Sequence, residues 1–265
     1  MLVHSRGARW AVWAVFLVLF LPLFALPLLV VLAASFATNW SGVLPSGFTT
    51  GHYDAATRGE ALSALTTSLL TALAASLLAL AAGTWAALAA AALRGRYRRV
   101  MDALFVLPVA VPSVVVGLAI LVAFSKPPFL LNGTREIVIL AHTVLVTAFS
   151  YQSVSAAITR LDPAYEQAAA SLGARPAYVL WRVRLPLLLP SLTAAAGLCF
   201  ALSTGELSAT MMLYPPDWTP LPVLVHAATD RGALFAGSAL AMVLMAATLL
   251  VLLAMSRLRN RASYR

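Results

Sequence analysis

The chain has 265 residues, of which 62% are hydrophobic and only 10% are charged, and its mean hydropathy is +0.90. This composition lies outside that of soluble globular domains and predicts an integral membrane protein in a lipid bilayer. The net charge of +9 is explained by basic loops that orient such a chain, so no nucleic-acid partner is expected. A single cysteine, Cys199, excludes an internal disulfide and suggests no thiolate-bound metal site.

Six stretches of the chain can cross a bilayer, because a spanning helix needs about 20 mostly apolar residues. We predict an all-α fold in which residues 1–265 form a single transmembrane domain. The predicted spans cover residues 10–37, 61–93, 103–124, 137–158, 191–214 and 233–255. The first exceeds the apolar region of a signal peptide in length, so we expect a retained anchor.

Basic residues are distributed unevenly among the segments that join these spans. One side of the predicted membrane holds the arginines Arg6, Arg9, Arg94, Arg96, Arg98, Arg99, Arg160, Arg175, Arg182, Arg184, Arg257, Arg259, Arg261 and Arg265. The other side holds only Arg58, Lys126, Arg135 and Arg231. Because basic loops stay in the cytoplasm, we predict that both termini and the loop over residues 159–190 are cytoplasmic.

Helix-bending and polar residues in the third and fourth spans are candidates for lining a translocation pathway. Pro112 indicates a bent or unwound segment beside a cavity, although prolines are also tolerated as packing kinks. Tyr151 adds a polar group to a face that suits water, and an ordinary bond between helices explains it equally well. His142 offers a titratable group, and a neutral hydrogen-bonding role is the simpler interpretation.

The loop over residues 159–190 predicts a short helix at the membrane surface. Asp162 is a favourable N-cap residue, and Pro163 follows it at the first helical position. Glu166 then lies near the positive end of the helix dipole. Gly173 is expected to end this helix, because glycine adopts the left-handed conformation common at helix ends.

A second short helix is predicted to follow, starting near Ala177 and ending at a proline-marked break at Pro186. The small residues Ala168 and Ala169 allow another protein surface to approach the first helix closely. Arg175 and the other arginines of the loop offer charge-assisted pairing around such a contact.

The loop resembles the EAA loop of permease subunits of binding-protein-dependent, type I ATP-binding cassette importers. That pattern is EAA, three residues, Gly, nine residues and Ile-x-Leu-Pro, and its positions correspond here to Gln167, Ala168, Ala169, Gly173, Val183, Leu185 and Pro186. The stretches "LPVAVPSVVVGLAI" and "GELSATMMLYPPDWTPLPVLV" extend the resemblance over most of the chain. The branch that looks most similar transports 2-aminoethylphosphonate, with ferric-iron and thiamine permeases nearby.

One position departs from the pattern, since Gln167 replaces the usual glutamate and an acid, Glu166, precedes it. The two side chains point about 100° apart on a helix, so the family's contact with the ATPase is either altered or made by Glu166. The resemblance implies a coupling site formed by Glu166, Gln167, Ala168, Ala169, Gly173, Arg175, Val183, Leu185 and Pro186. The alternative is a solvated basic surface helix.

The resemblance also implies a set of partners and a location. We expect the type I importer permease fold, six transmembrane helices and the bacterial cytoplasmic (inner) membrane. The expected partners are a cytoplasmic ATPase dimer, an identical or paralogous second permease and an extracytoplasmic substrate-binding protein. ATP and Mg are expected on the partner ATPase and no cofactor on this chain, which has no GxxxxGK[ST] motif.

Glu206 is the acid that lies deepest in a predicted span. A carboxylate in hydrocarbon costs about 2.5–3.5 kcal/mol on insertion scales, so it should face a partner, water or the pathway. We expect Glu206 and Ser203 to line the pathway and guide an amine-bearing substrate such as 2-aminoethylphosphonate. The alternative is a structural glutamate bonded to helix ends near Gly205. After this span, the proline-rich loop is expected to expose Trp218 as an interfacial anchor or a docking surface.

Two other classes of function compete with an importer permease. A proton-coupled secondary transporter would use Glu206 and His142 as a titrating pair. An intramembrane enzyme would need a convergent catalytic set, and the sequence shows no such set and no metal-binding HExxH motif. We therefore predict a transport subunit with no catalytic residues.

Overall fold

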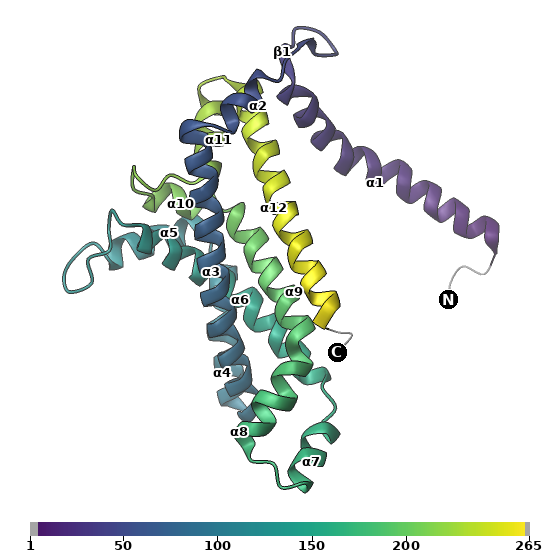
Figure 1. Ribbon diagram of the computed structural model, residues 1–265, viewed down its shortest axis with the longest axis vertical. Coiled ribbons are helices and arrows are strands. Elements are labelled where there is room, and N and C mark those ends of the chain that lie inside the picture. Colours follow the sequence, from purple (N-terminus) through teal and green to yellow (C-terminus); the bar gives the residue numbers. More distant parts are fainter. Residues whose placement is uncertain (1–4, 263–265) are drawn as a thin grey trace. The chain divides into compact units, whose positions relative to one another are not determined.

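The computed structural model describes the backbone of residues 5–262 and the side chains of residues 5–257. Two short strands, β1 (Ala37–Asn39) and β2 (Ser46–Phe48), pair antiparallel, and the other elements are helices (Figure 1). The helices are α1 (Arg6–Ser35), α2 (Gly51–Ala56), α3 (Gly59–Ala92), α4 (Arg96–Ala110), α5 (Ser113–Ala123), α6 (Arg135–Arg160), α7 (Ala164–Ser171), α8 (Pro176–Val179), the π-helical turn η1 (Leu180–Arg184), α9 (Leu185–Thr204), α10 (Ser208–Leu213), α11 (Leu221–Asp230) and α12 (Leu234–Ala262). Arg265 and the side chains of Arg259 and Arg261, counted above, lie outside this description.

Five helices within residues 5–262 are long and apolar enough to cross a membrane, and a sixth span results if the bent pair of α4 and α5 is counted as one. The five are α1, α3, α6, the continuous helix over Pro176–Thr204 and α12 as far as Arg257. The predicted all-α membrane fold is therefore confirmed. Two of the predicted spans, however, differ from the structure in shape.

The third predicted span, residues 103–124, is a broken helix in the structure. α4 begins earlier, at Arg96, and meets α5 at an angle of 104°. Val111 is extended, with φ −100° and ψ 132°, because the ring of the following proline disfavours helical backbone. Pro112 then starts α5, and its carbonyl accepts the first backbone bonds of that helix from Val115 and Val116. The predicted bend at Pro112 is confirmed.

The fifth predicted span, residues 191–214, is displaced toward the N-terminus. The expected break at Pro186 was wrong, because α8, η1 and α9 form one continuous helix. The widened π turn, in which the Leu185 N–H reaches the Leu180 carbonyl, accommodates the proline that follows. The helix ends at Thr204, and α10 begins only after Gly205 and two further residues.

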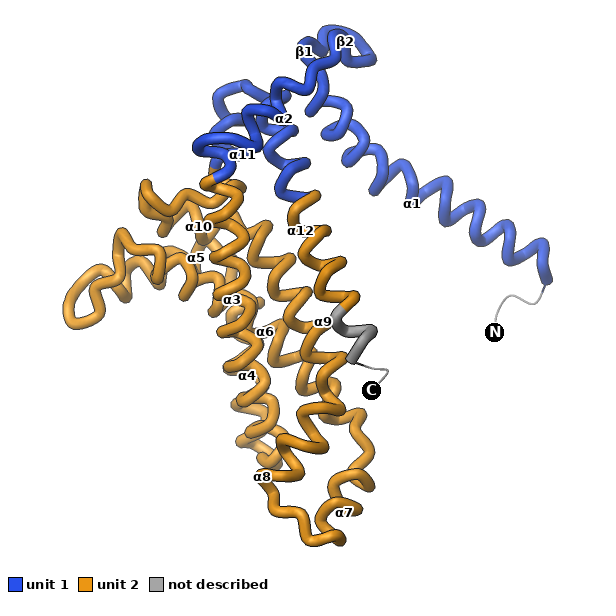
Figure 2. Tube along the Cα trace, viewed as in Figure 1, with its two compact units in different colours: residues 1–62, 224–245 blue, residues 63–223, 246–265 orange. Residues whose placement is uncertain are grey.

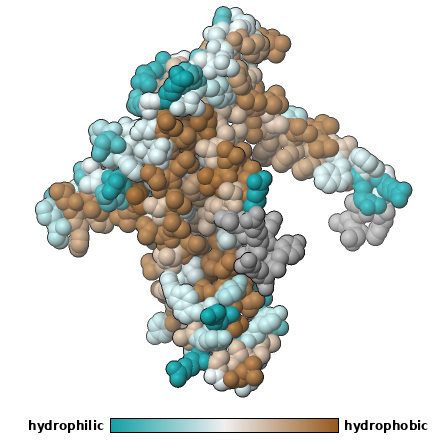
Figure 3. Space-filling model, viewed as in Figure 1, coloured by the Kyte–Doolittle hydropathy of each residue, from teal (hydrophilic) through white to brown (hydrophobic). Residues whose placement is uncertain are grey.

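The chain divides into two compact units, which are coloured separately in Figure 2. Unit 1 comprises residues 1–62 and 224–245, and unit 2 comprises residues 63–223 and 246–265. Every site residue proposed from the sequence falls in unit 2. The surface of unit 2 is hydrophobic along α3 and carries hydrophilic residues at the end that bears α7 and α8 (Figure 3).

In unit 1, α1 is followed by the two strands and by α2. The Ser35 hydroxyl at the end of α1 lies 2.7 Å from the Tyr53 hydroxyl, and His52 Nε2 lies 3.1 Å from the Ala37 carbonyl. These contacts attach α2 to the end of the first helix. The apolar side chains of α1 are exposed along its length, as a helix surrounded by lipid would be.

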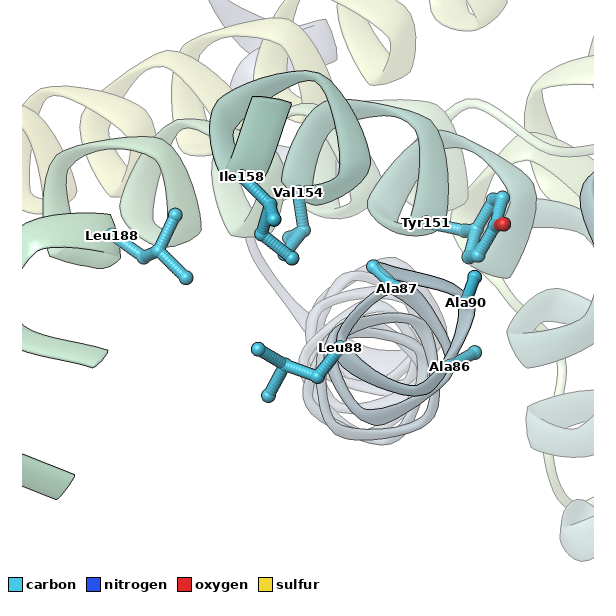
Figure 4. Close-up of a cluster of buried hydrophobic side chains, with 8 residues drawn as sticks. All are labelled: Ala86, Ala87, Leu88, Ala90, Tyr151, Val154, Ile158 and Leu188. Carbon is cyan, nitrogen blue, oxygen red and sulfur yellow. The ribbon is translucent and has the colours of Figure 1, made fainter. Parts of the chain in front are cut away.

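In unit 2, small side chains bring α3 close to α6. The buried cluster in Figure 4 consists of Ala86, Ala87, Leu88 and Ala90 from α3, Tyr151, Val154 and Ile158 from α6, and Leu188 from α9. One turn before the cluster, a Cβ atom on Gly83 would lie 2.6 Å from Ser150 Oγ and 2.8 Å from the Tyr151 nitrogen. Only glycine allows this approach of the two helices.

Candidate functional site

The loop over residues 159–190, hereafter the α7 loop, begins with the predicted short helix. The Asp162 carboxylate accepts a hydrogen bond of 2.9 Å from the Ala164 N–H and so caps the first turn of α7. At the other end, Gly173 is left-handed with φ +81°. Its N–H donates to the Ala170 carbonyl at 2.9 Å, and the next N–H reaches the Ala169 carbonyl at 3.1 Å. This pair of bonds is a Schellman motif, as expected from a terminal glycine.

Glu166 has a partner within the α7 loop. Its carboxylate forms an ion pair of 3.1 Å with Arg184 Nε, and the two side chains are 39% and 26% exposed. The pair ties α7 to η1. Gln167, at the position of the family's glutamate, is exposed instead, as is Ala168. The structure thus directs Glu166 inward and leaves Gln167 on the surface.

The other residues proposed for coupling divide between the surface and the interior. Gly173, Arg175 and Pro186 are exposed. Ala169, Val183 and Leu185 are half-buried, and Leu185 packs against the cluster of Figure 4. The leucine of the Leu-Pro pair therefore anchors the end of the loop to the cluster of α3 and α6, whereas the region around Gly173 forms an exposed surface.

Sequence reasoning missed two exposed hydrophobic side chains on this surface. Leu172 is 88% exposed and Tyr165 is 57% exposed. They lie seven positions apart, which places them on the same side of α7 and its final turn. Large apolar side chains that are exposed on a helix of alanine and polar residues indicate an interaction site. Their presence in this surface helix was the available signal in the sequence.

A cavity of about 360 Å³ lies where two interrupted helices of unit 2 meet. We call it the pathway cavity. It is lined by Pro108, Val109, Val111, Pro112 and Ser113 at the break between α4 and α5, by His142, Leu145, Val146 and Phe149 of α6, and by Leu202, Ser203 and Glu206 at the end of α9. The structure thus brings together Pro112, Ser203 and Glu206, which were proposed from distant parts of the sequence.

Glu206 has two roles in the structure. It lines the cavity, and its Oε1 accepts a hydrogen bond of 2.8 Å from the Ala209 N–H in the first turn of α10. The carboxylate therefore satisfies a backbone group that the interruption of the helix leaves free. The bond is the one that the structural interpretation predicts, and the position in the cavity wall is the one that the pathway interpretation requires.

His142 is buried and joins three helices. Its Nδ1 lies 2.7 Å from Ser203 Oγ, and its Nε2 lies 2.8 Å from Thr210 Oγ1. The Thr210 hydroxyl donates its hydrogen to the Glu206 carbonyl at 3.0 Å, so Nε2 must donate to Thr210. In a neutral imidazole, Nδ1 then accepts from Ser203. The contacts agree with the hydrogen-bonding interpretation; nothing in the sequence marked Thr210 as a partner.

Tyr151 is not among the residues that line the pathway cavity, and the structure supports the alternative of an ordinary bond between helices. Its hydroxyl donates to Oδ1 of Asp102 in α4, and its ring stacks on Phe105 at 4.9 Å between centroids. Its burial is explained by packing against α3. Asp102 was also missed, although an acid beside an apolar span is an available signal.

Trp218 is half-buried, so the predicted exposure of this side chain was wrong, while the predicted anchor or docking role of the loop stays a prediction. Its Nε1 donates to Thr71 Oγ1 at 2.9 Å, and the Arg135 guanidinium lies 5.7 Å from its ring centroid. Nearby, the Leu221 N–H donates to Ser68 Oγ at 2.7 Å. The loop is therefore fastened to α3, because the buried indole N–H needs an acceptor.

Comparison with known proteins gives a consistent result. Residues 79–263 match the family described as "Binding-protein-dependent transport system inner membrane component". A permease protein of Salmonella typhimurium named for 2-aminoethylphosphonate transport is 47% identical over 261 residues, which are 98% of each chain.

Solved structures share the fold at low sequence identity. A bacterial alginate ABC transporter, solved with a periplasmic protein that carries an alginate pentasaccharide, superposes with a TM-score of 0.76 at 18% identity over 96% of both chains. The inward-facing methionine transporter MetNI gives 0.66 at 15% identity, over 76% of this chain and 95% of that one. With the family match and the full-length relative, these findings show that the chain belongs to the inner membrane components of binding-protein-dependent transport systems, the permeases of ABC importers.

Proposed function

We propose that this permease receives the motion of a separate ATPase through the α7 loop and imports 2-aminoethylphosphonate or another small polar solute. Permeases of this family are transport subunits and not enzymes, so ATP and Mg would be bound by the partner ATPase. The coupling proposal rests on one observation: α7 is exposed, and hydrogen bonds fix both of its ends, at Asp162 and at Gly173. A helix fixed at both ends can transmit a displacement, whereas a flexible loop would absorb it.

The surface around α7 suits a protein partner. Gln167 and Ala168 are exposed with small or uncharged side chains, and Leu172 adds an apolar contact. Behind this surface, the Glu166–Arg184 ion pair ties α7 to η1, and the half-buried Leu185 packs the following helix against the cluster of α3 and α6. We propose that an ATPase dimer binds here, with a second permease, identical or paralogous, completing the complex.

The proposed orientation follows from charge. The α7 loop and both termini lie on the side that carries most of the arginines, which is the cytoplasmic side for a membrane protein. The opposite side would receive an extracytoplasmic binding protein. A periplasmic protein accompanies the alginate transporter of the same fold, which supports this type of partner.

The pathway cavity supports a substrate with a positively charged end. Among the described residues that line it, Glu206 is the only ionisable carboxylate, and none is a lysine or an arginine. A carboxylate at such a depth favours an ammonium group as its partner. The name of the Salmonella relative points to the same class, because 2-aminoethylphosphonate carries a primary amine.

The proton-coupled alternative has weaker support. Both ring nitrogens of His142 bind hydroxyl groups, and the backbone of α10 engages the Glu206 carboxylate. Transport measurements separate the two mechanisms. Proteoliposomes containing the complex and its binding protein should accumulate radiolabelled 2-aminoethylphosphonate only with ATP on the ATPase side. Uptake that persists without ATP but collapses with the proton gradient would establish the alternative.

Coupling through α7 is tested by replacing Gly173 with valine. The left-handed φ disfavours a β-branched residue by about 1–2 kcal/mol, although an added Cβ would meet no atom within 4 Å. We expect the variant to insert in the membrane but to lose co-purification with the ATPase and ATP-driven uptake. Unchanged co-purification and unchanged transport-stimulated hydrolysis would refute the coupling assignment.

A matched control is available at Gly133. This glycine is also left-handed, with φ +77°, and also has open space around its missing Cβ. It lies in the segment between α5 and α6, at the opposite end of α6 from α7. Gly133→Val imposes similar backbone strain, and we expect it to leave ATPase binding intact.

A further inference from the structure

Asp102 and Tyr151 form a bridge between α4 and α6 that the transport pathway described above does not use. Oδ1 of Asp102 accepts the Tyr151 hydroxyl hydrogen bond, and Oδ2 lies 4.0 Å from Nε of Arg98, one turn earlier in α4. The Tyr151 ring stacks on Phe105, with an angle of 18° between the ring planes. A polar contact and an aromatic contact thus join the same two helices at the same level.

Both helices line the pathway cavity, α4 at its break with α5 and α6 from His142 to Phe149, but only α6 also leads to the α7 loop. From Asp102, α4 continues to Pro108, where its residues begin to form the wall of the pathway cavity. From Tyr151, α6 continues to Arg160 and then into the α7 loop. At 1.5 Å per residue, the bridge is about 9 Å from Pro108 along α4, and along α6 it is about 3 Å from the lining residue Phe149 and about 13.5 Å from Arg160.

The two sides of the bridge differ in how firmly they are held. Tyr151 is 2% exposed, and Figure 4 shows its ring beside the α3 alanines Ala87 and Ala90. In contrast, no residue of α4 is fully buried, and the Asp102 side chain is 44% exposed. The position of α4 therefore depends strongly on its contacts with α6, because burial elsewhere contributes little.

We propose that Asp102 and Tyr151 are positioning residues that lock α4 to α6, so that movement of the α7 loop is carried to the cavity wall at Pro108–Ser113. Without the lock, α6 would move with the ATPase while α4 and the wall lag behind. This inference rests on the proposed coupling function. It adds a route by which motion of the α7 loop reaches the wall at Pro108–Ser113, through the side chains of Asp102 and Tyr151 as well as through the backbone.

A cysteine reporter in the cavity wall measures the motion directly. Cys199 is the only cysteine of the chain, and Cys199→Ser keeps a donor for the Val146 carbonyl that its thiol now contacts at 3.3 Å. In this background, Ser113→Cys places a thiol on the cavity wall. The rate at which a soluble maleimide labels this thiol is measured in the complex with its ATPase, with and without a non-hydrolysable ATP analogue.

We expect the analogue to change the labelling rate in the otherwise unmodified reporter. Tyr151→Phe removes only the hydroxyl and keeps the ring on Phe105. It should reduce the nucleotide-dependent change in labelling rate about 10-fold, because a factor of that size corresponds to the free energy of a hydrogen bond to a charged acceptor. Tyr97→Phe is the matched control in α4, since among the described side chains its hydroxyl accepts a bond from the neighbouring Arg96 alone, at 3.0 Å. It should leave the change intact.

Asp102→Ala should reproduce the effect of Tyr151→Phe, and the double variant should be no worse than either single one. If Tyr151→Phe prevents assembly, the same labelling measurement is made on Asp102→Asn, which has the same shape but is a weaker hydrogen-bond acceptor. Loss of response with ATPase binding intact supports the lock. A full response in the assembled variants overturns it. No response in the unmodified reporter would instead refute the proposed coupling itself.

Discussion

The contacts that stabilise the α7 loop join residues closer in sequence than the contacts that stabilise the pathway cavity. In the loop, Asp162 caps a backbone group two positions away, and Glu166 pairs with Arg184, 18 positions further along. In the cavity, His142 bonds to Ser203 and Thr210, which lie 61 and 68 positions away. The loop keeps its shape through local geometry and leaves a face open. The cavity exists only while α6, α9 and α10 stay in register.

The difference predicts that the two regions respond differently to the same kind of substitution. Strain in the α7 loop should impair binding to the ATPase and spare the fold. Strain in the cavity should impair the fold itself, because several helices share each contact there.

The largest expected effect is that of Gly117→Val, next to the cavity. A Cβ atom at this α5 position would lie 2.8 Å from Cα and 3.0 Å from the carbonyl oxygen of Ala209 in α10. Separating the two helices should lower the free energy of unfolding by about 1–3 kcal/mol. Thermal unfolding and the yield of monodisperse protein in detergent would measure the loss. Yield and stability equal to the unmodified protein would contradict the proposed packing.

A second substitution sharpens this test. Ala209→Gly removes only the Cβ contact at 3.2 Å and leaves the two backbone clashes. It should therefore fail to rescue Gly117→Val. In contrast, Gly173→Val should give normal yield and lose only the interaction with the ATPase.

An intermediate effect is expected at Glu206, where two variants separate its two roles. Glu206→Gln keeps an oxygen for the Ala209 N–H but loses the charge, so uptake of 2-aminoethylphosphonate should fall about 10-fold with stability unchanged. Glu206→Ala also loses the cap, which should cost about 1 kcal/mol of stability. Uptake and thermal unfolding are measured on both variants. Full uptake by the glutamine variant would leave Glu206 with its structural role alone.

The smallest effect is expected for the Glu166–Arg184 ion pair of the α7 loop. Because both side chains are partly exposed, the pair should contribute about 0.2–1 kcal/mol. Glu166→Gln should weaken binding of the ATPase by less than about fivefold, measured by titration of the purified subunits. The exchanged pair Glu166→Arg with Arg184→Glu should recover most of the loss. A total loss of binding with Glu166→Gln would mean that the ATPase contacts this carboxylate directly.

Sequence patterns predicted those features that depend on neighbouring residues. The composition indicated a membrane protein, Gly173 indicated the end of α7, and Pro112 indicated the bend of the third span. Each follows from the conformational limits of one residue or from the hydropathy of one segment. The spacing from Gln167 to Pro186 indicated the family, because that pattern also lies within one short stretch of the chain.

Predictions failed where a contact with a distant element decides the outcome. Trp218 was expected on the surface, but Thr71 supplies an acceptor that holds it against α3. For Tyr151, the sequence left the pathway and a bond between helices equally open, and its contacts with Asp102 and Phe105 in α4 supply that bond. No local pattern specifies such partners, because they lie on other helices.

By itself, the sequence determined that this chain spans a membrane and carries a short helix ended by glycine on a basic loop, and the residue pattern of that loop resembled the importer permeases. The span and the helix depend on hydropathy, charge and backbone preference, which neighbouring residues specify. Only the tertiary structure decided that Glu206 and Pro112 share a cavity, that Glu166 turns inward, and that Asp102 meets Tyr151. Such contacts arise when helices far apart in the chain pack together, and packing depends on the shapes of all the facing side chains at once.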